Sequence, residues 1–207
     1  MKNASVLLTT GFALGMLSVS AYAVPVAAPG TESSLILVQS EGPVMGTYEG
    51  SGASYSNDLY LMLDALGNPG KDGNPANDRF ILNNHSVSVG ESVNFGTFSR
   101  GTDLSFRLHV NATGFDYFTG APSDNPDGMH HARAAGNELT NTTLLSFEDL
   151  HGGGDNNFSD MSISLSNTLT AAIPASIPEP ETYAMLLAGL GMIGAITRRR
   201  RMLSRQG

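Results

Sequence analysis

Short stretches of alternating apolar and polar residues run through the middle of the chain. In residues 104–110, Leu, Phe, Leu and Val alternate with Ser, Arg and His; in residues 161–166, Met, Ile and Leu alternate with serines. A period of two predicts strands with one face in the core and one face in solvent. His109 is expected on the solvent face of the first strand.

Further short apolar runs predict additional strands, and they are separated by polar loops. The runs cover residues 35–38, 59–63, 80–82, 87–95 and 144–147. Residues 64–78 hold three glycines, two prolines, three asparagines and three aspartates, so no helix continues through them. Away from the chain ends there is no helical period. The pattern therefore predicts an all-β domain, a β-sandwich with jelly-roll or Greek-key connections.

The first residues have the pattern of a secretory signal peptide. Lys2 supplies a positive start, residues 6–19 are apolar or small, and Ala21-Tyr22-Ala23 offers a small-x-small cleavage site. Residues 1–23 are therefore expected to direct export through the Sec pathway.

The C-terminal end combines three features that together suit a membrane. Pro178-Glu179-Pro180 is a rigid extended triplet, because proline disfavours helix at the residue before it. The thirteen residues 184–196 carry no charge, fewer than the roughly 20 that a spanning helix needs, so residues 183–197 could cross a membrane only marginally. The stop that follows, facing the cytoplasm, consists of Arg198, Arg199, Arg200 and Arg201.

This tripartite tail resembles the PEP-CTERM sorting signal of Gram-negative bacteria, which is also labelled an ice-binding protein C-terminal motif. The resemblance implies recognition by an exosortase, a membrane cysteine protease that removes the tail. The precursor would then be anchored in the inner membrane, and the product would reach the cell surface or the extracellular matrix. An ordinary, unprocessed tail anchor is the alternative.

The segment between the two signals, residues 24–177, is strongly acidic. It holds five basic and seventeen acidic residues, a formal charge of −12, while the whole chain has −8 and no cysteine. Such a charge argues against nucleic acid as a partner. Without cysteine, neither disulfides nor thiol chemistry can contribute, so stability must come from packing or a metal.

The densest group of acidic residues lies in residues 148–160, between two predicted strands. Glu148, Asp149, Asp155 and Asp160 surround a triple glycine, which lets the backbone fold back on itself. Oxygen ligands on a flexible loop suit Ca²⁺, and Asp155 and Asp160 are the preferred ligands. A solvated acidic turn is the alternative. Glu148 and Asp149 are expected to diverge as strand neighbours, which argues against a glycosidase pair.

The same loop also carries a second resemblance. Phe147-Glu148-Asp149-Leu150, the glycines, Asp155 and Asp160 resemble the C-terminal signature of the DUF4114 domain, an FEDL-GGGD-x-x-Y-N-D pattern, although Phe158 and Ser159 replace its Tyr and Asn. Looser similarity extends over residues 48–167. The resemblance implies a surface β domain without a characterised activity.

The remaining motifs predict no catalytic site. Adjacent His130 and His131 lack a zinc-binding spacing and are expected to pack or hydrogen-bond in a loop; residues 72–78 lack two EF-hand ligands. We therefore expect a non-enzymatic surface protein that binds Ca²⁺, with an exosortase and an extracellular polysaccharide as partners. A carbohydrate- or ice-binding module is the alternative.

The sequence divides the chain into six parts: a signal peptide (1–23), a linker with the first strand (24–47), a DUF4114-like β-sandwich domain (48–170), a linker with the PEP triplet (171–182), a transmembrane segment (183–197) and an arginine-rich cytoplasmic tail (198–207).

Overall fold

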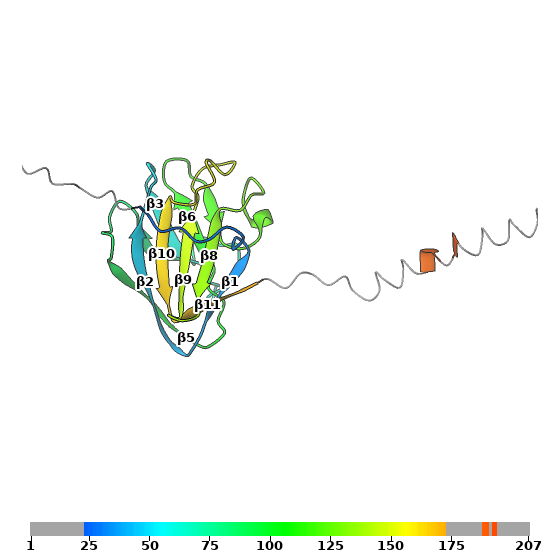
Figure 1. Cartoon of the computed structure of the whole chain (residues 1–207), viewed down its shortest axis with the longest axis horizontal. Coiled ribbons are helices and arrows are strands. Elements are labelled where there is room, and N and C mark those ends of the chain that lie inside the picture. Colours follow the sequence, from blue (N-terminus) through cyan, green and yellow to red (C-terminus); the bar gives the residue numbers. More distant parts are fainter. Residues whose placement is uncertain (1–22, 173–187, 191, 194–207) are drawn as a thin grey trace, which may run out of the picture.

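Antiparallel strands form three sheets in the computed structural model, which describes residues 23–172, 188–190 and 192–193 (Figure 1). The five-stranded sheet has the order β5 (Ser92–Phe98), β2 (Gly42–Gly50), β10 (Met161–Ser166), β9 (Thr142–Phe147) and β8 (Ala132–Asn137). The four-stranded sheet has the order β4 (Arg79–Asn83), β3 (Asn57–Leu61), β6 (Phe106–Val110) and β7 (Asp116–Phe118). β1 (Ser34–Val38) pairs with β11 (Thr168–Ala172), and Pro122–Asp124 form a 3-10 helix, η1. The all-β prediction is confirmed.

The two larger sheets share one hydrophobic core. Phe95 on β5 and Phe106 on β6 are fully buried, and their ring centroids lie 5.7 Å apart in an edge-to-face arrangement. Gly46 on β2 leaves room for this packing, because a Cβ there would collide with the Phe95 ring and lie 2.8 Å from Ile163 Cδ1. Both sheets also contribute aliphatic core residues, namely Val44, Leu59, Leu61, Leu108, Leu145, Ile163 and Leu165.

Several strands lie where the pattern predicted none. Three of them, β2, β8 and β11, are rich in Gly, Ala or Thr and lack a strong apolar alternation. They form strands by pairing with distant or neighbouring strands: β2 pairs with β10, β8 with β9, and β11 with β1. β1 and β2 extend the folded domain before residue 48, because they pair with strands from the end of the domain.

The side chains on the polar side of β6 are more buried than the alternating sequence pattern predicted. Arg107 is only 6% exposed: its Nε donates to Asp78 at 2.6 Å and a terminal nitrogen donates to Asp116 at 2.7 Å. The guanidinium also lies over the Tyr60 ring, 4.1 Å from its centroid. Arg107 can be buried because two carboxylates offset the cost of removing its charge from water. His109 is half-buried and contacts Asp116 at 2.9 Å.

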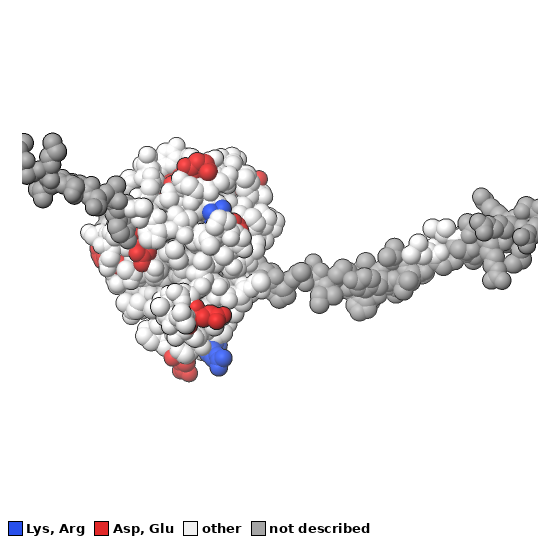
Figure 2. Space-filling model, viewed as in Figure 1, with Lys and Arg blue, Asp and Glu red and all other residues white. Residues whose placement is uncertain are grey.

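Acidic side chains are scattered over the face shown in Figure 2, and basic ones are fewer there. The acidic excess of the sequence therefore does not gather into one patch on that face.

Most predictions for the two chain ends lie outside the described residues. These are the signal peptide up to residue 22, the PEP triplet and the four arginines. Residues 188–190 and 192–193 of the expected transmembrane segment are helical. Within the described ranges, no helix has the length and apolar character needed to cross a membrane.

Candidate metal centre

The loop at residues 148–160 connects two strands that pair directly. β9 ends at Phe147, β10 begins at Met161, and these two residues face each other in the ladder. The Asp160 amide donates to the Phe147 carbonyl at 3.0 Å, which closes the loop at its base. Glu148 and Asp160 are therefore brought side by side by strand register, although twelve positions separate them.

The loop backbone repeatedly adopts the left-handed region. φ is positive at Gly152, Gly153 and Gly154, and also at Asn156 and Phe158. At Gly154 the glycine is required by space as well, because a Cβ would collide with Glu148 Oε1 and lie 2.9 Å from Leu150 Cβ. The triple glycine thus allows the loop to fold closely over the Glu148 carboxylate.

Phe158 has an unusual backbone conformation for a bulky side chain, with a positive φ of 56°. Such a conformation costs on the order of 1–2 kcal/mol. The ring is 2% exposed, and the Arg133 guanidinium lies 3.8 Å from its centroid. Burial and this cation–π contact offset the strain and hold the end of the loop.

Glu148, Asp149 and Asp160 form a compact carboxylate cluster. One oxygen of each lies within 4.8 Å of the others. Glu148 is fully buried and Asp149 is 4% exposed. Asp160 accepts from the Asp149 amide at 2.9 Å, and Asp149 accepts from Asn57 Nδ2 at 2.7 Å. These contacts orient the cluster but leave three acidic groups close together.

The electrostatics of the cluster favour a positive ligand. Burial raises the pKa of Glu148 to about 8, and the nearby Asp160 charge adds to the effect. Burial also raises the pKa of Asp149 to about 6; the Asn57 hydrogen bond opposes this shift, whereas the Asp160 charge reinforces it. Both carboxylates are therefore poorly stabilised as anions by the protein alone.

Three buried polar atoms at or near the cluster have no hydrogen-bond partner among the described residues. They are Glu148 Oε2, Asn57 Oδ1 and the Tyr117 hydroxyl. Burial raises the pKa of Tyr117 to about 12, and the charges of Asp127, Asp149 and Glu148 contribute. Buried polar atoms normally have partners, so these atoms point to a bound group that their oxygens could contact.

A buried histidine joins this cluster to the loop before β8. His131 Nδ1 lies 2.9 Å from the Glu148 backbone carbonyl, and Nε2 lies 2.8 Å from Asp127 Oδ2. Burial alone would raise the pKa of Asp127, but hydrogen bonds from Gly152 and His131 lower it to about 2. Because a backbone carbonyl only accepts, Nδ1 donates to Glu148. His131 stacks on Tyr117 with both ring nitrogens already engaged, so it is not free to ligate zinc.

The structure brings together three of the four acids that the sequence proposed as ligands. Asp155 is exposed, and its carboxylate instead accepts from the Asn157 amide at 3.1 Å and from Asn157 Nδ2 at 2.6 Å. The expectation that Glu148 and Asp149 diverge is wrong, because β9 ends before them and both enter the cluster.

Sequence reasoning missed Asn57, Tyr117 and Asp127, while His131 has the hydrogen-bonding role that was expected. Asn57 lies 92 positions from Asp149, so no local spacing could have identified it.

Two family models match the chain. The model of the DUF4114 domain, a domain of unknown function, covers residues 80–168 and thus the whole carboxylate loop. The model of the PEP-CTERM protein-sorting motif covers residues 176–201. Both resemblances are confirmed. The DUF4114 segment runs from the second residue of β4 to the first residue of β11. The sorting motif implies a secreted surface protein processed by an exosortase. No curated protein matches the chain.

Proposed function

We propose that this chain is a non-enzymatic, exported surface protein whose β domain binds Ca²⁺ through Glu148, Asp149 and Asp160. Its destination would be the cell surface or the polysaccharide layer outside a Gram-negative cell, after Sec export, inner-membrane anchoring and exosortase processing. The chain passes back and forth between the two larger sheets, because β2 and β5 lie in one sheet while β3, β4, β6 and β7 lie in the other. These crossovers support a sandwich of the jelly-roll or Greek-key type as its scaffold.

The observation that carries the metal proposal is the buried, unpartnered Glu148 Oε2 inside a group of three carboxylates. A buried carboxylate is normally paired or coordinates a metal. The cation would replace the missing partner and offset the mutual repulsion of the three acids.

Ca²⁺ fits this group better than other common ions. The candidate ligands are carboxylate and amide oxygens on a loop of irregular shape, and Ca²⁺ accepts roughly 6–8 such oxygens at about 2.3–2.6 Å. Oxygens on opposite sides of Ca²⁺ are then about 5 Å apart, compatible with the 4.8 Å limit of the cluster. Mg²⁺ demands shorter bonds and near-octahedral geometry, and zinc sites usually contain His or Cys.

Thermal melting of the purified protein tests the proposal. If Ca²⁺ binds only the folded state, a concentration of about 100 times its Kd stabilises by about 2.7 kcal/mol. For a domain of this size, Tm should rise by roughly 5–10 °C relative to EDTA. Glu148→Gln should abolish the rise, whereas Asp155→Asn, in the same loop but outside the cluster, should retain it.

Two results would contradict the proposal. The same rise with Na⁺ at equal ionic strength would indicate simple screening of the acidic domain. A rise that persists in Glu148→Gln would place the ion elsewhere.

A further inference from the structure

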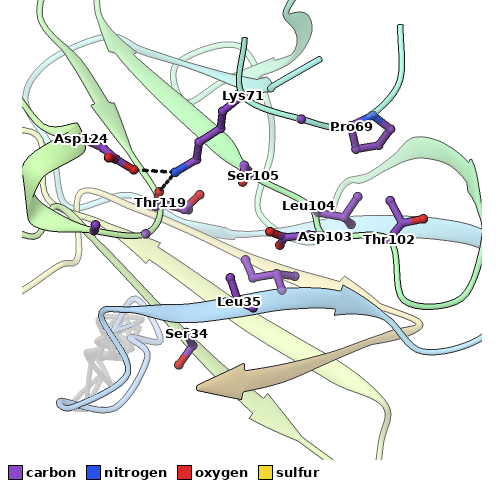
Figure 3. Close-up of a pocket in the computed structure, with 14 residues that line it drawn as sticks. Ser34, Leu35, Pro69, Lys71, Thr102, Asp103, Leu104, Ser105, Thr119 and Asp124 are labelled. Carbon is purple, nitrogen blue, oxygen red and sulfur yellow. Dashed lines mark hydrogen bonds and ion pairs between the residues drawn. The ribbon is translucent and has the colours of Figure 1, made fainter. Parts of the chain in front are cut away.

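A concave site lies away from the carboxylate cluster. A cavity of about 540 Å³ opens between β1, the segment 69–71, the segment 102–105 and the turn 119–124 (Figure 3). It shares no lining residue with the carboxylate cluster. Its size is within the roughly 300–1,000 Å³ typical of small-molecule sites.

One wall of the cavity holds a fixed positive charge. Lys71 Nζ donates to the Thr119 carbonyl at 2.7 Å and to Asp124 at 2.8 Å. Gly120 permits this approach, because a Cβ there would lie 2.9 Å from Lys71 Nζ. An ammonium has three N–H donors, so one remains for a ligand after these two bonds. The lysine is thus positioned by the fold before anything binds.

Asp103 supplies an exposed carboxylate that lines the same cavity. Figure 3 shows it between Leu35 on β1 and Lys71 on the other side of the cavity. Burial raises the pKa of Asp103, while the Lys71 charge and a hydrogen bond with the Ile36 backbone oppose the shift. Within the described protein, no side chain donates a hydrogen bond to Asp103, so its oxygens retain acceptor capacity.

The rest of the lining is neutral and mixed. Ser105 is 8% exposed, while Leu35, Leu104 and Pro69 present apolar surface. No aromatic ring is among the residues that line the cavity, so a ligand would lie within it rather than on a stacking platform.

We propose that this cavity binds a neutral sugar unit of a surface glycan. Sugar hydroxyls can donate to Asp103 and accept from Lys71, and the C–H faces can contact Leu35 and Leu104. A purely anionic ligand would face Asp103 and Asp124, and a purely cationic ligand would face Lys71. A neutral polyhydroxy ring can hydrogen-bond to the exposed groups of both signs without being repelled by either.

Binding should be measured by calorimetry and ligand-observed NMR on the purified protein, using neutral mono- and oligosaccharides selected from a glycan array. Asp103→Ala removes the acceptor and should weaken binding at least tenfold. Leu35→Trp places bulk in the cavity without removing a hydrogen bond and should also prevent binding. Glu138→Gln, an exposed substitution outside the cavity, is the matched control and should bind like the wild type.

The melting curves of all variants separate loss of binding from loss of folding. The proposal is overturned if no neutral glycan binds the folded protein, or if binding is unchanged in both cavity variants. A diamine that binds instead, with the same sensitivity to Asp103→Ala, would also overturn it. Measurements in Ca²⁺ and in EDTA distinguish this site from the carboxylate cluster, because sugar binding should persist without metal while the domain remains folded.

Discussion

The imidazole of His131 donates from Nδ1 to the backbone carbonyl of Glu148, across 2.9 Å. This bond joins the loop before β8 to the first residue after β9. The other ring nitrogen holds Asp127, whose Oδ2 also accepts from the Gly152 amide at 2.7 Å. His131 therefore holds the first part of the carboxylate loop, at Glu148 directly and at Gly152 through Asp127.

Replacing this histidine should destabilise the domain strongly. His131→Phe retains an aromatic ring beside Tyr117 but leaves the Asp127 carboxylate without its histidine partner. Breaking a buried pair in this way costs about 3–5 kcal/mol, which corresponds to a fall in Tm of roughly 6–20 °C. Thermal melting measures the effect, with His85→Phe at an exposed position as the control. Equal melting temperatures would exclude a structural role for the pair.

A glycine substitution should separate backbone strain from damage to the carboxylate cluster. Gly154→Ala places a methyl group against Glu148 Oε1, whereas Gly152→Ala has a similarly unfavourable φ but nothing within 4 Å. Both variants should lose about 1 kcal/mol from the left-handed backbone. Only Gly154→Ala should also lose the Ca²⁺-induced rise in Tm. If both variants keep that rise, close packing over Glu148 is unimportant for the metal.

The metal-free domain should become less stable as pH rises. The folded-state pKa values of Glu148 and Asp149, about 8 and about 6, lie above the ordinary 4.5 and 3.8. The folded protein therefore binds more protons than the unfolded chain between pH 4 and 8. Their stabilising contribution is complete below about pH 4 and is lost as pH rises through about 6 and then 8.

Melting in EDTA from pH 5 to 8 measures this loss, and Glu148→Gln should reduce it because that group no longer ionises. Ca²⁺ should counteract the fall, since the cation binds the ionised carboxylates. The prediction is contradicted if the metal-free Tm rises between pH 5 and 8 and Glu148→Gln shows the same pH dependence. Ionisation of the buried carboxylates would then not destabilise the folded domain.

Sorting should depend on the proline-glutamate-proline triplet. Pro178→Ala combined with Glu179→Ala should leave a longer, membrane-retained species in cells that contain the exosortase. Intact mass spectrometry of the membrane and surface fractions measures the processing. Identical masses for mutant and wild type would show that the triplet is dispensable.

The arginine cluster should act as a stop in the membrane. Replacing Arg198, Arg199, Arg200 and Arg201 with Ser or Gln should release part of the chain from the membrane, because thirteen uncharged residues anchor poorly alone. Fractionation in a host without the exosortase isolates this effect from cleavage. Unchanged retention there would argue that the apolar run is a sufficient anchor.

Local sequence determined the features whose physical cause is local. Alternation at residues 161–166 predicted β10, since side chains along a strand point to opposite faces. The order of triplet, apolar run and arginines likewise identified the sorting motif, because that motif is read as a continuous segment. The triple glycine marked a loop that had to turn back on itself.

Tertiary structure decided which of the loop acids meet. Pairing of Phe147 with Met161 places Glu148 beside Asp160, and the end of β9 lets Asp149 join them, while Asp155 forms a local turn instead. Asn57 and His131 reach the same place from distant segments. Strand register and long-range contacts are set by the packing of the whole core, so spacing within one loop could not determine them.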